Sequence, residues 1–216
     1  MTKRINSTEK APEFQIVTVS CRVEGVRPLL MQNGDLVNPL NPFVVAKKAI
    51  TSKRGKNLTD DDQLKIAHLS FQGALWLGID GLPCVIAEAI DGVIRDGGRF
   101  SNKGKSLEKY VMCLDDAKLN YRGMEDINCV ADLIKRFNEF KFQKRTVNAG
   151  VQKTSVWSTR PRFNDWWIEF DLQVTLGGEV DLDTVQTALV HGGRTIGLGS
   201  WHRRYGFFKV TKFNKV

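Results

Sequence analysis

Strict alternation of apolar and polar residues marks two stretches of this chain, and such alternation is typical of half-buried β-strands. The first stretch begins at Phe14, and apolar residues hold every second position from Val17 to Val23. The second runs from Trp167 to Thr175, with apolar side chains at the even-numbered positions. We therefore predict a strand at each place.

Two other stretches have apolar residues at the three- and four-residue spacing of an amphipathic helix. One begins with Pro83 and continues through Ile94 before it meets Gly97–Gly98. The other follows Asp181, a residue type that caps helices well, and reaches Gly192–Gly193. Because glycine commonly ends helices, we predict that each helix stops at its glycine pair.

Weaker patterns predict further elements between these four. The residues Asn148-Ala149-Gly150 separate two β-prone segments and predict a hairpin. The remaining predictions are a helix capped by Thr59 with an apolar face of Leu64, Ala67 and Phe71, a strand and turn over 73–83, a strand over 107–119, a short helix over 127–137, and a last strand from Tyr205 to Thr211.

The order of these elements predicts a fold. A strand and a helix occur in the first half, separated by a long insertion, and the last third has the order strand, helix, glycine loop, strand. Two such units predict an α+β, ferredoxin-like (RRM-like) fold, with helices on one face of an antiparallel sheet and a basic β-hairpin arm. We expect residues 1–13 to be a flexible tail and residues 14–216 to form a single domain with insertions.

Composition changes this picture mainly through charge. The 216 residues carry a formal net charge of +8, which favours anionic partners such as nucleic acid. The chain has no apolar run of membrane-spanning length and begins with a polar segment, so we expect a cytoplasmic protein that contacts no membrane. The four cysteines form no C-x-x-C pair, and we expect reduced, mostly buried thiols and no metal site.

The predicted hairpin is the first candidate binding segment. Between Lys141 and Phe163 the sequence contains no acidic residue. Such one-sided charge suits a phosphate backbone, although a solvated basic arm that protects a sheet edge is the alternative. The candidate contacts in this segment are Lys141, Lys144, Arg145, Lys153, Arg160 and Arg162.

The second candidate is the glycine-rich segment from Gly193 to Val210. It is not a dinucleotide-binding fingerprint, because it follows a helix, leads into a strand and has His202 where the last glycine belongs. Its glycines permit a tight turn in any case, and they would also let a phosphate approach the backbone. Its aromatic residues either stack on bases or belong to the core. The candidate contacts are Gly197, Gly199, Trp201, His202, Arg203, Arg204 and Tyr205.

The segments "TRPRFNDWWIEFDLQV" and "IGLGSWHRRYGFFKV", with a weaker match at "LPCVIAEAIDGVIRD", resemble the RAMP superfamily. This superfamily comprises the RRM-like subunits of CRISPR effector complexes and their relatives, and the resemblance extends to phage-encoded proteins of this type. The family's glycine-rich loop corresponds to Gly197, Gly199 and Gly206. One departure is that the family's loop often ends Gly-x-Gly, whereas this one ends Gly206-Phe207-Phe208.

The resemblance implies a bacterial or phage-infected cell, binding of single-stranded RNA or DNA on the sheet face and the arm, and side-by-side assembly along a strand. Together with the basic segments it favours a nucleic-acid binding protein without a cofactor. One alternative is a metal-independent endoribonuclease in which His202 is the acid or base, although the sequence offers no second catalytic group. Another is an interaction protein, either a structural subunit or an inhibitor that copies a CRISPR subunit.

Overall fold

The computed structural model describes residues 14–52, 58–147, 155–177, 179–202 and 204–216; for residues 145–147 and 155–157 it describes the backbone alone. The predicted tail at 1–13 and the predicted turn at 148–150 therefore lie outside the described residues. The elements follow in this order: β1 (Gln15–Gly25), β2 (Leu29–Leu30), η1 (Gly34–Val37), α1 (Pro42–Thr51), α2 (Asp60–Gly73), β3 (Cys84–Val85), α3 (Ala87–Gly98), η3 (Arg99–Ser101), α4 (Gly104–Tyr110), β4 (Val111–Cys113), β5 (Ala117–Lys118), α5 (Val130–Lys135), α6 (Phe137–Phe140), β6 (Lys141–Val147), β7 (Ser155–Phe163), β8 (Trp167–Leu176), α7 (Leu182–Thr195) and β9 (Phe208–Lys215).

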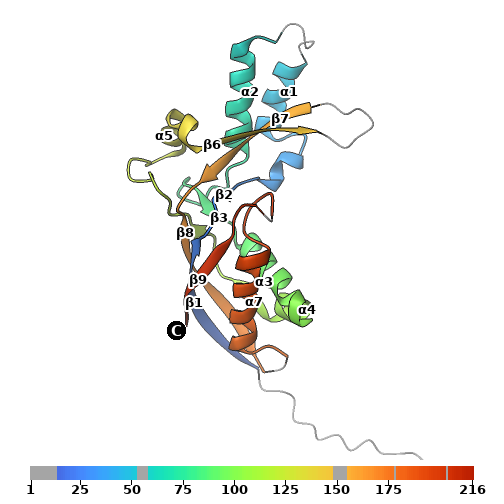
Figure 1. Ribbon diagram of the computed structural model, residues 1–216, viewed down its shortest axis with the longest axis vertical. Coiled ribbons are helices and arrows are strands. Elements are labelled where there is room, and N and C mark those ends of the chain that lie inside the picture. The colour runs from blue at the N-terminus through green and yellow to red at the C-terminus, as the bar shows by residue number, and fades with distance from the viewer. Residues whose placement is uncertain (1–13, 53–57, 148–154, 178, 203) are drawn as a thin grey trace, which may run out of the picture.

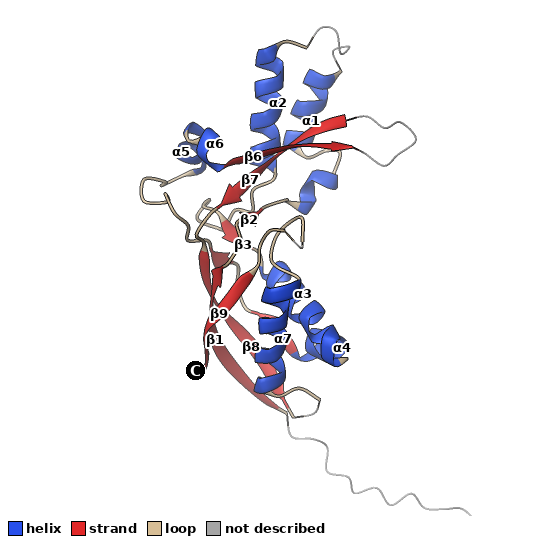
Figure 2. Ribbon diagram, viewed as in Figure 1, coloured by secondary structure: helices blue, strands red, loops and turns tan. Residues whose placement is uncertain are grey.

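The main sheet is antiparallel throughout, with the strand order β4-β8-β1-β9. Both strands predicted from alternation are in it, side by side, and the register pairs Val19 with Leu172. The apolar residues from Val17 to Val23 are buried, as their alternation predicts. Figure 2 shows α3, α4 and α7 together on one side of this sheet, so the buried half of the alternation lies beneath helices.

A second sheet, in the order β2-β7-β6, forms the predicted hairpin arm. Strands β6 and β7 pair from Lys141 with Pro161 to Val147 with Ser155. In Figure 1 the arm lies beside α1 and α2, at the opposite end of the molecule from α4 and the C-terminus. One continuous cluster of buried residues nevertheless extends through both sheets, because it includes Val19 of β1 as well as Phe163 of β7.

Both capping predictions are confirmed, but one of the two helix ends is wrong. Thr59 and Asp62 form a reciprocal capping box at α2, and Asp181 accepts a hydrogen bond from the backbone N–H of Thr184 at α7. Helix α3 stops at Gly98 as predicted, whereas α7 continues past its glycine pair to Thr195. The reason is packing against α3, because a Cβ atom at Gly192 would lie 2.7 Å from the carbonyl oxygen of Val93.

Several other predicted boundaries are also wrong. Helix α3 begins at Ala87 rather than at Pro83, because Cys84–Val85 first pairs with β5. The predicted strand over 107–119 begins inside α4 and contains only β4 and β5. The segment 73–83 contains an isolated bridge between Leu77 and Pro83 in place of a strand. The predicted helix over 127–137 is divided between α5 and α6.

Candidate nucleic-acid interface

The glycine loop occupies residues 196–207, between α7 and β9, as the sequence predicts. The predicted last strand therefore begins three residues later than expected, at Phe208. The loop closes on itself through a hydrogen bond from the N–H of Leu198 to the oxygen of Gly206, at 2.9 Å. It is also attached to the segment around β2, because Ser200 and Gly206 donate to the oxygens of Leu30 and Pro28 at 2.7 and 2.8 Å.

The glycines of this loop allow the chain to approach itself closely. Gly199 and Gly206 have φ values of +80° and +73°, which are strained for other residues. A Cβ atom at Gly206 would collide with the backbone of Leu198, and one at Gly199 would collide with the oxygen of Leu30. The space beside these glycines is therefore filled by protein backbone, which supports the conformational interpretation of the motif over close approach of a phosphate there.

An aromatic and cationic cluster forms where the loop meets the arm. The ring of Phe142 on β6 contacts those of Trp201 and Tyr205, each with centroids 5.4 Å apart. The ammonium of Lys144 lies 5.0 Å from the centroid of the Trp201 ring, and the guanidinium carbon of Arg160 lies 4.8 Å from it. We call these five residues the Trp201 cluster. Since β-strand side chains alternate, Phe142 and Lys144 share one face of the arm, and the loop packs on that face.

Arg160 connects the arm to the loop. Its Nη1 donates to Ser200 Oγ on the loop, and its Nε donates to Ser158 Oγ on the same strand at 3.3 Å. Partial burial lowers the pKa of the Arg160 guanidinium, but an arginine stays charged at neutral pH. Arg162 lies two residues along the same face of β7, and its buried Nε has no hydrogen-bond partner among the described residues.

The other predicted site residues lie apart from this cluster or outside the described residues. Lys141 lies over the ring of Phe137, at 5.2 Å, on the opposite face of the arm. His202 and Arg204 are exposed on the loop, and His202 Nδ1 lies 3.1 Å from the oxygen of Ile196. The backbone of Arg145 is in β6, but its side chain, Lys153 and Arg203 are outside the described residues.

Sequence reasoning missed two members of this interface. Phe142 and Ser200 were not singled out, because neither residue type carries a distinctive signal by itself. The pairing of Phe142 with Arg160 across the hairpin is the signal that would have found Phe142. The register of β6 against β7 depends on how many residues connect the two strands. The sequence predicts that a turn occurs there but does not predict the residues at which pairing begins.

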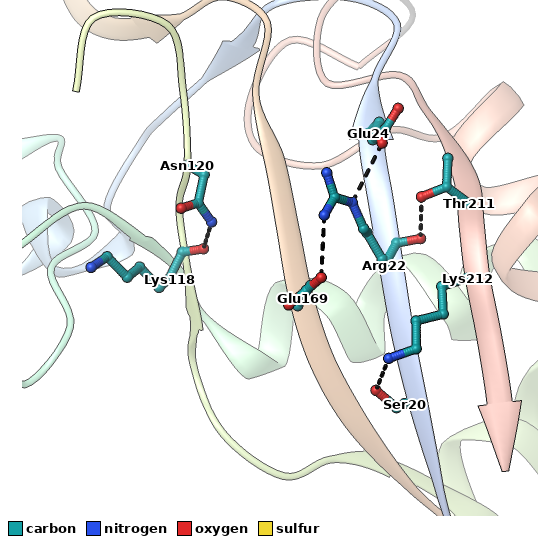
Figure 3. Close-up of polar contacts among 8 residues, drawn as sticks. All are labelled: Ser20, Arg22, Glu24, Lys118, Asn120, Glu169, Thr211 and Lys212. Atoms are coloured by element: carbon teal, nitrogen blue, oxygen red, sulfur yellow. Dashed lines mark hydrogen bonds and ion pairs between the residues drawn. The ribbon is translucent and has the colours of Figure 1, made fainter. Parts of the chain in front are cut away.

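The open face of the main sheet has a different character. Arg22 stacks on the ring of Trp167 at 4.0 Å and forms ion pairs with Glu24 and Glu169, at 3.4 and 3.3 Å, as Figure 3 shows for the two carboxylates. Lys209 also pairs with Glu24, and its hydrogen bond lowers the pKa of that carboxyl. Carboxylates on this face therefore neutralise Arg22 and Lys209, whereas Lys212 donates to Ser20 Oγ at 3.2 Å.

Among the described residues, no three or more His, Cys, Asp or Glu side chains lie together as a metal site would require. Within the same residues, His202 forms no ion pair with a carboxylate that would orient it as an acid or base. The helices that the structure describes include none that is long and apolar enough to cross a membrane.

Comparison with known proteins provides no assigned function for this interface, so its chemistry is the basis for interpreting it. No protein-family model matches the chain, and a search of the curated proteins finds no relative.

Proposed function

We propose that this protein binds single-stranded nucleic acid, RNA or DNA, at the junction of the glycine loop and the arm. The observation that carries the proposal is the Trp201 cluster, in which Lys144 and Arg160 lie against one aromatic ring with Arg162 further along β7. Neither contributing segment contains an acidic residue: residues 141–163 and 184–216 have none. A positive surface with aromatic rings is the combination that single-stranded nucleic acids require.

A ferredoxin-like assignment of the main sheet belongs to the same proposal. The elements β1, α3, β4, β8, α7 and β9 follow the order strand, helix, strand, strand, helix, strand. Strand β8 lies between β1 and β4 in the sheet, which is the arrangement of a split βαβ unit. A glycine loop between the second helix and the last strand agrees with the resemblance to the RAMP superfamily.

We assign binding to the loop and the arm rather than to the open face of the main sheet. On that face Arg22 and Lys209 are paired with Glu24, and Arg22 is also paired with Glu169, whereas Lys212 donates to Ser20. A nucleic-acid strand would have to break these pairs and would then meet the two carboxylates. Among the described residues, Lys144 and Arg160 have no carboxylate partner; Lys144 lies against the Trp201 ring, and Arg160 also donates to Ser200 and Ser158.

The test is a titration of fluorescently labelled single-stranded RNA and DNA at low salt, followed by anisotropy. The variant K144Q/R160Q should weaken binding at least about tenfold, because two phosphate contacts are lost. The control K105Q/K215Q removes the same charge from α4 and from the far end of β9, and it should change affinity little. Equal losses in both variants, or no binding by the unaltered protein, would refute the proposed site.

The same titration checks the RNA after incubation. Intact RNA is the result we expect. Cleavage that His202→Ala abolishes would replace the binding function by the ribonuclease alternative.

A further inference from the structure

A cavity of about 480 Å³ opens between α3, α4 and the β4 edge of the main sheet. Its walls combine the apolar side chains of Ile94 and Leu107 with the ring of Tyr110 and the polar groups of Gln173 and Thr175. Figure 1 shows α4 well removed from the arm, so the cavity is separate from the Trp201 cluster. Its size and mixed lining are those of a small-ligand site.

Two carboxylates of α3 line this cavity. Glu88 and Asp91 are three residues apart and therefore lie on the same face of the helix. Asp91 is half-buried, and its Oδ1 accepts a hydrogen bond from the N–H of Cys113 at 2.8 Å. Burial raises the pKa of the Asp91 carboxyl, and the charge of Glu88 raises it further. A cation placed beside Asp91 would counteract this rise, because its positive charge favours the ionised carboxylate.

The cationic groups of the wall already have partners. Arg95 pairs with Asp96 at 2.9 Å and with Glu108 at 3.6 Å, and the ammonium of Lys109 lies 4.8 Å from the centroid of the Tyr110 ring. Among the residues that the structure describes, none forms an ion pair with Glu88 or Asp91. The cavity therefore has a local excess of negative charge in a chain whose net charge is +8.

We propose that this cavity binds an organic cation, a protonated amine or guanidinium on a short apolar stem. The charged end pairs with Asp91 and Glu88, and the stem lies against Met112, the apolar lining side chain that is about half exposed (49%). Tyr110 adds a ring face to which a cation is attracted. Anionic ligands are disfavoured, because the unpaired charges are carboxylates. General attraction of cations to this basic chain is weak, so saturable binding would identify a local site.

The first experiment compares two probes of the same shape by isothermal titration. Butylguanidine is a cation on a four-carbon stem, whereas N-butylurea is its neutral analogue. Butylguanidine should bind saturably below ~10 mM, a range appropriate to a ligand of this size, and N-butylurea should not. Absence of saturable butylguanidine binding, or equal binding of the two probes, would overturn the proposal.

Variants connect the binding to the cavity. Asp91→Asn keeps an oxygen that can accept from Cys113 and should weaken butylguanidine at least about tenfold. Glu88→Gln, at an exposed position, should weaken it less and tests the site even if the Asp91 variant fails to fold. The control Asp183→Asn removes an exposed carboxylate of α7, away from the cavity. If both cavity variants bind as the control does, the cavity is not the site.

Two further probes distinguish the sources of such a cation. Spermidine represents a free polyamine, and the blocked tripeptide Ala-Arg-Ala represents an arginine side chain presented by a protein. The probe that binds more tightly identifies the source, provided that Asp91→Asn weakens it. Tight binding that is insensitive to that substitution would contradict the proposal.

Discussion

At the residue scale, burial separates the four cysteines into two kinds. Cys21, Cys84 and Cys113 are buried, and burial raises the pKa of each thiol to about 12. Cys129 is exposed at the start of α5. The sequence predicts mostly buried, reduced thiols from their apolar neighbours, and the structure confirms that most are buried. The prediction does not identify the exposed one, because exposure depends on what packs against α5.

We expect iodoacetamide to label one thiol in the folded protein at about pH 8, because only a thiolate reacts. Mass spectrometry should place the label on Cys129, and all four cysteines should react after unfolding in urea. The variant Cys129→Ser should leave the folded protein unlabelled. Rapid labelling of Cys84 in the folded state would contradict the burial described above.

A second residue-scale prediction concerns Gly206. It has a positive φ, and a Cβ atom there would also collide with the backbone of Leu198. Gly206→Ala should therefore lower the free energy of unfolding by more than about 2 kcal/mol in urea denaturation. Gly81 has a similar φ, but a Cβ there would meet nothing within 4 Å, so Gly81→Ala should cost only about 1 kcal/mol. Equal costs would show that the collision is relieved by movement of the loop.

At the element scale, the sequence predicts most where the signal is local. The alternation of β1 and β8 and the caps Thr59 and Asp181 are each contained within a few consecutive residues, and all are confirmed. The predicted end of α7 at Gly192–Gly193 is wrong, because Gly192 packs against Val93 of α3, and no local sequence pattern reveals that contact. For the same reason the sequence does not predict that the residues of the Trp201 cluster contact one another. They come from three separate segments of the chain.

Gly92 of α3 and Gly192 of α7 are both helical glycines, but only Gly192 lies at the contact between the two helices. Substitution by alanine should therefore change the free energy of unfolding in opposite directions at the two positions. Gly192→Ala should lower the free energy of unfolding by about 1–3 kcal/mol, because its Cβ would lie 2.7 Å from the oxygen of Val93. Gly92→Ala should raise it by up to about 1 kcal/mol, since its Cβ would meet only Arg95 Nη2 at 4.0 Å and alanine favours helix. Thermal or urea unfolding measures both. A stabilising Gly192→Ala would mean that the helices do not cross there.

At the scale of the whole molecule, the two segments without acidic residues, 141–163 and 184–216, meet beside β2. Strand β2 pairs with β7, and the glycine loop is hydrogen-bonded to β2, so the cations of the arm and the loop face a common surface. The described cations there are Lys144, Arg160 and Arg162 on the arm, and Arg204 is exposed on the loop. Basic composition predicts an anionic partner, but the pairing of β6 with β7 and the contacts of the arm with the loop are what bring these groups together.

Binding of single strands should therefore weaken steeply with salt. Four phosphate contacts predict a slope of about −3 for the logarithm of the affinity against the logarithm of the salt concentration. The variant K144Q/R160Q should reduce the magnitude of this slope by about 1.4, because two of the four contacts are lost, and K105Q/K215Q should leave it unchanged. A slope near zero would mean that oligonucleotides bind without phosphate contacts.

The pairing of β2 with β7 also bears on how such a chain can be altered. Residues 26–86 lie between β1 and α3, and residues 114–166 lie between β4 and β8. Each segment supplies one side of the second sheet, and α2 of the first packs on β7 of the second. Removing either one would leave the other with an unpaired edge and an uncovered apolar face. The two segments therefore form one structural unit, and we expect that neither can be removed or transplanted without the other.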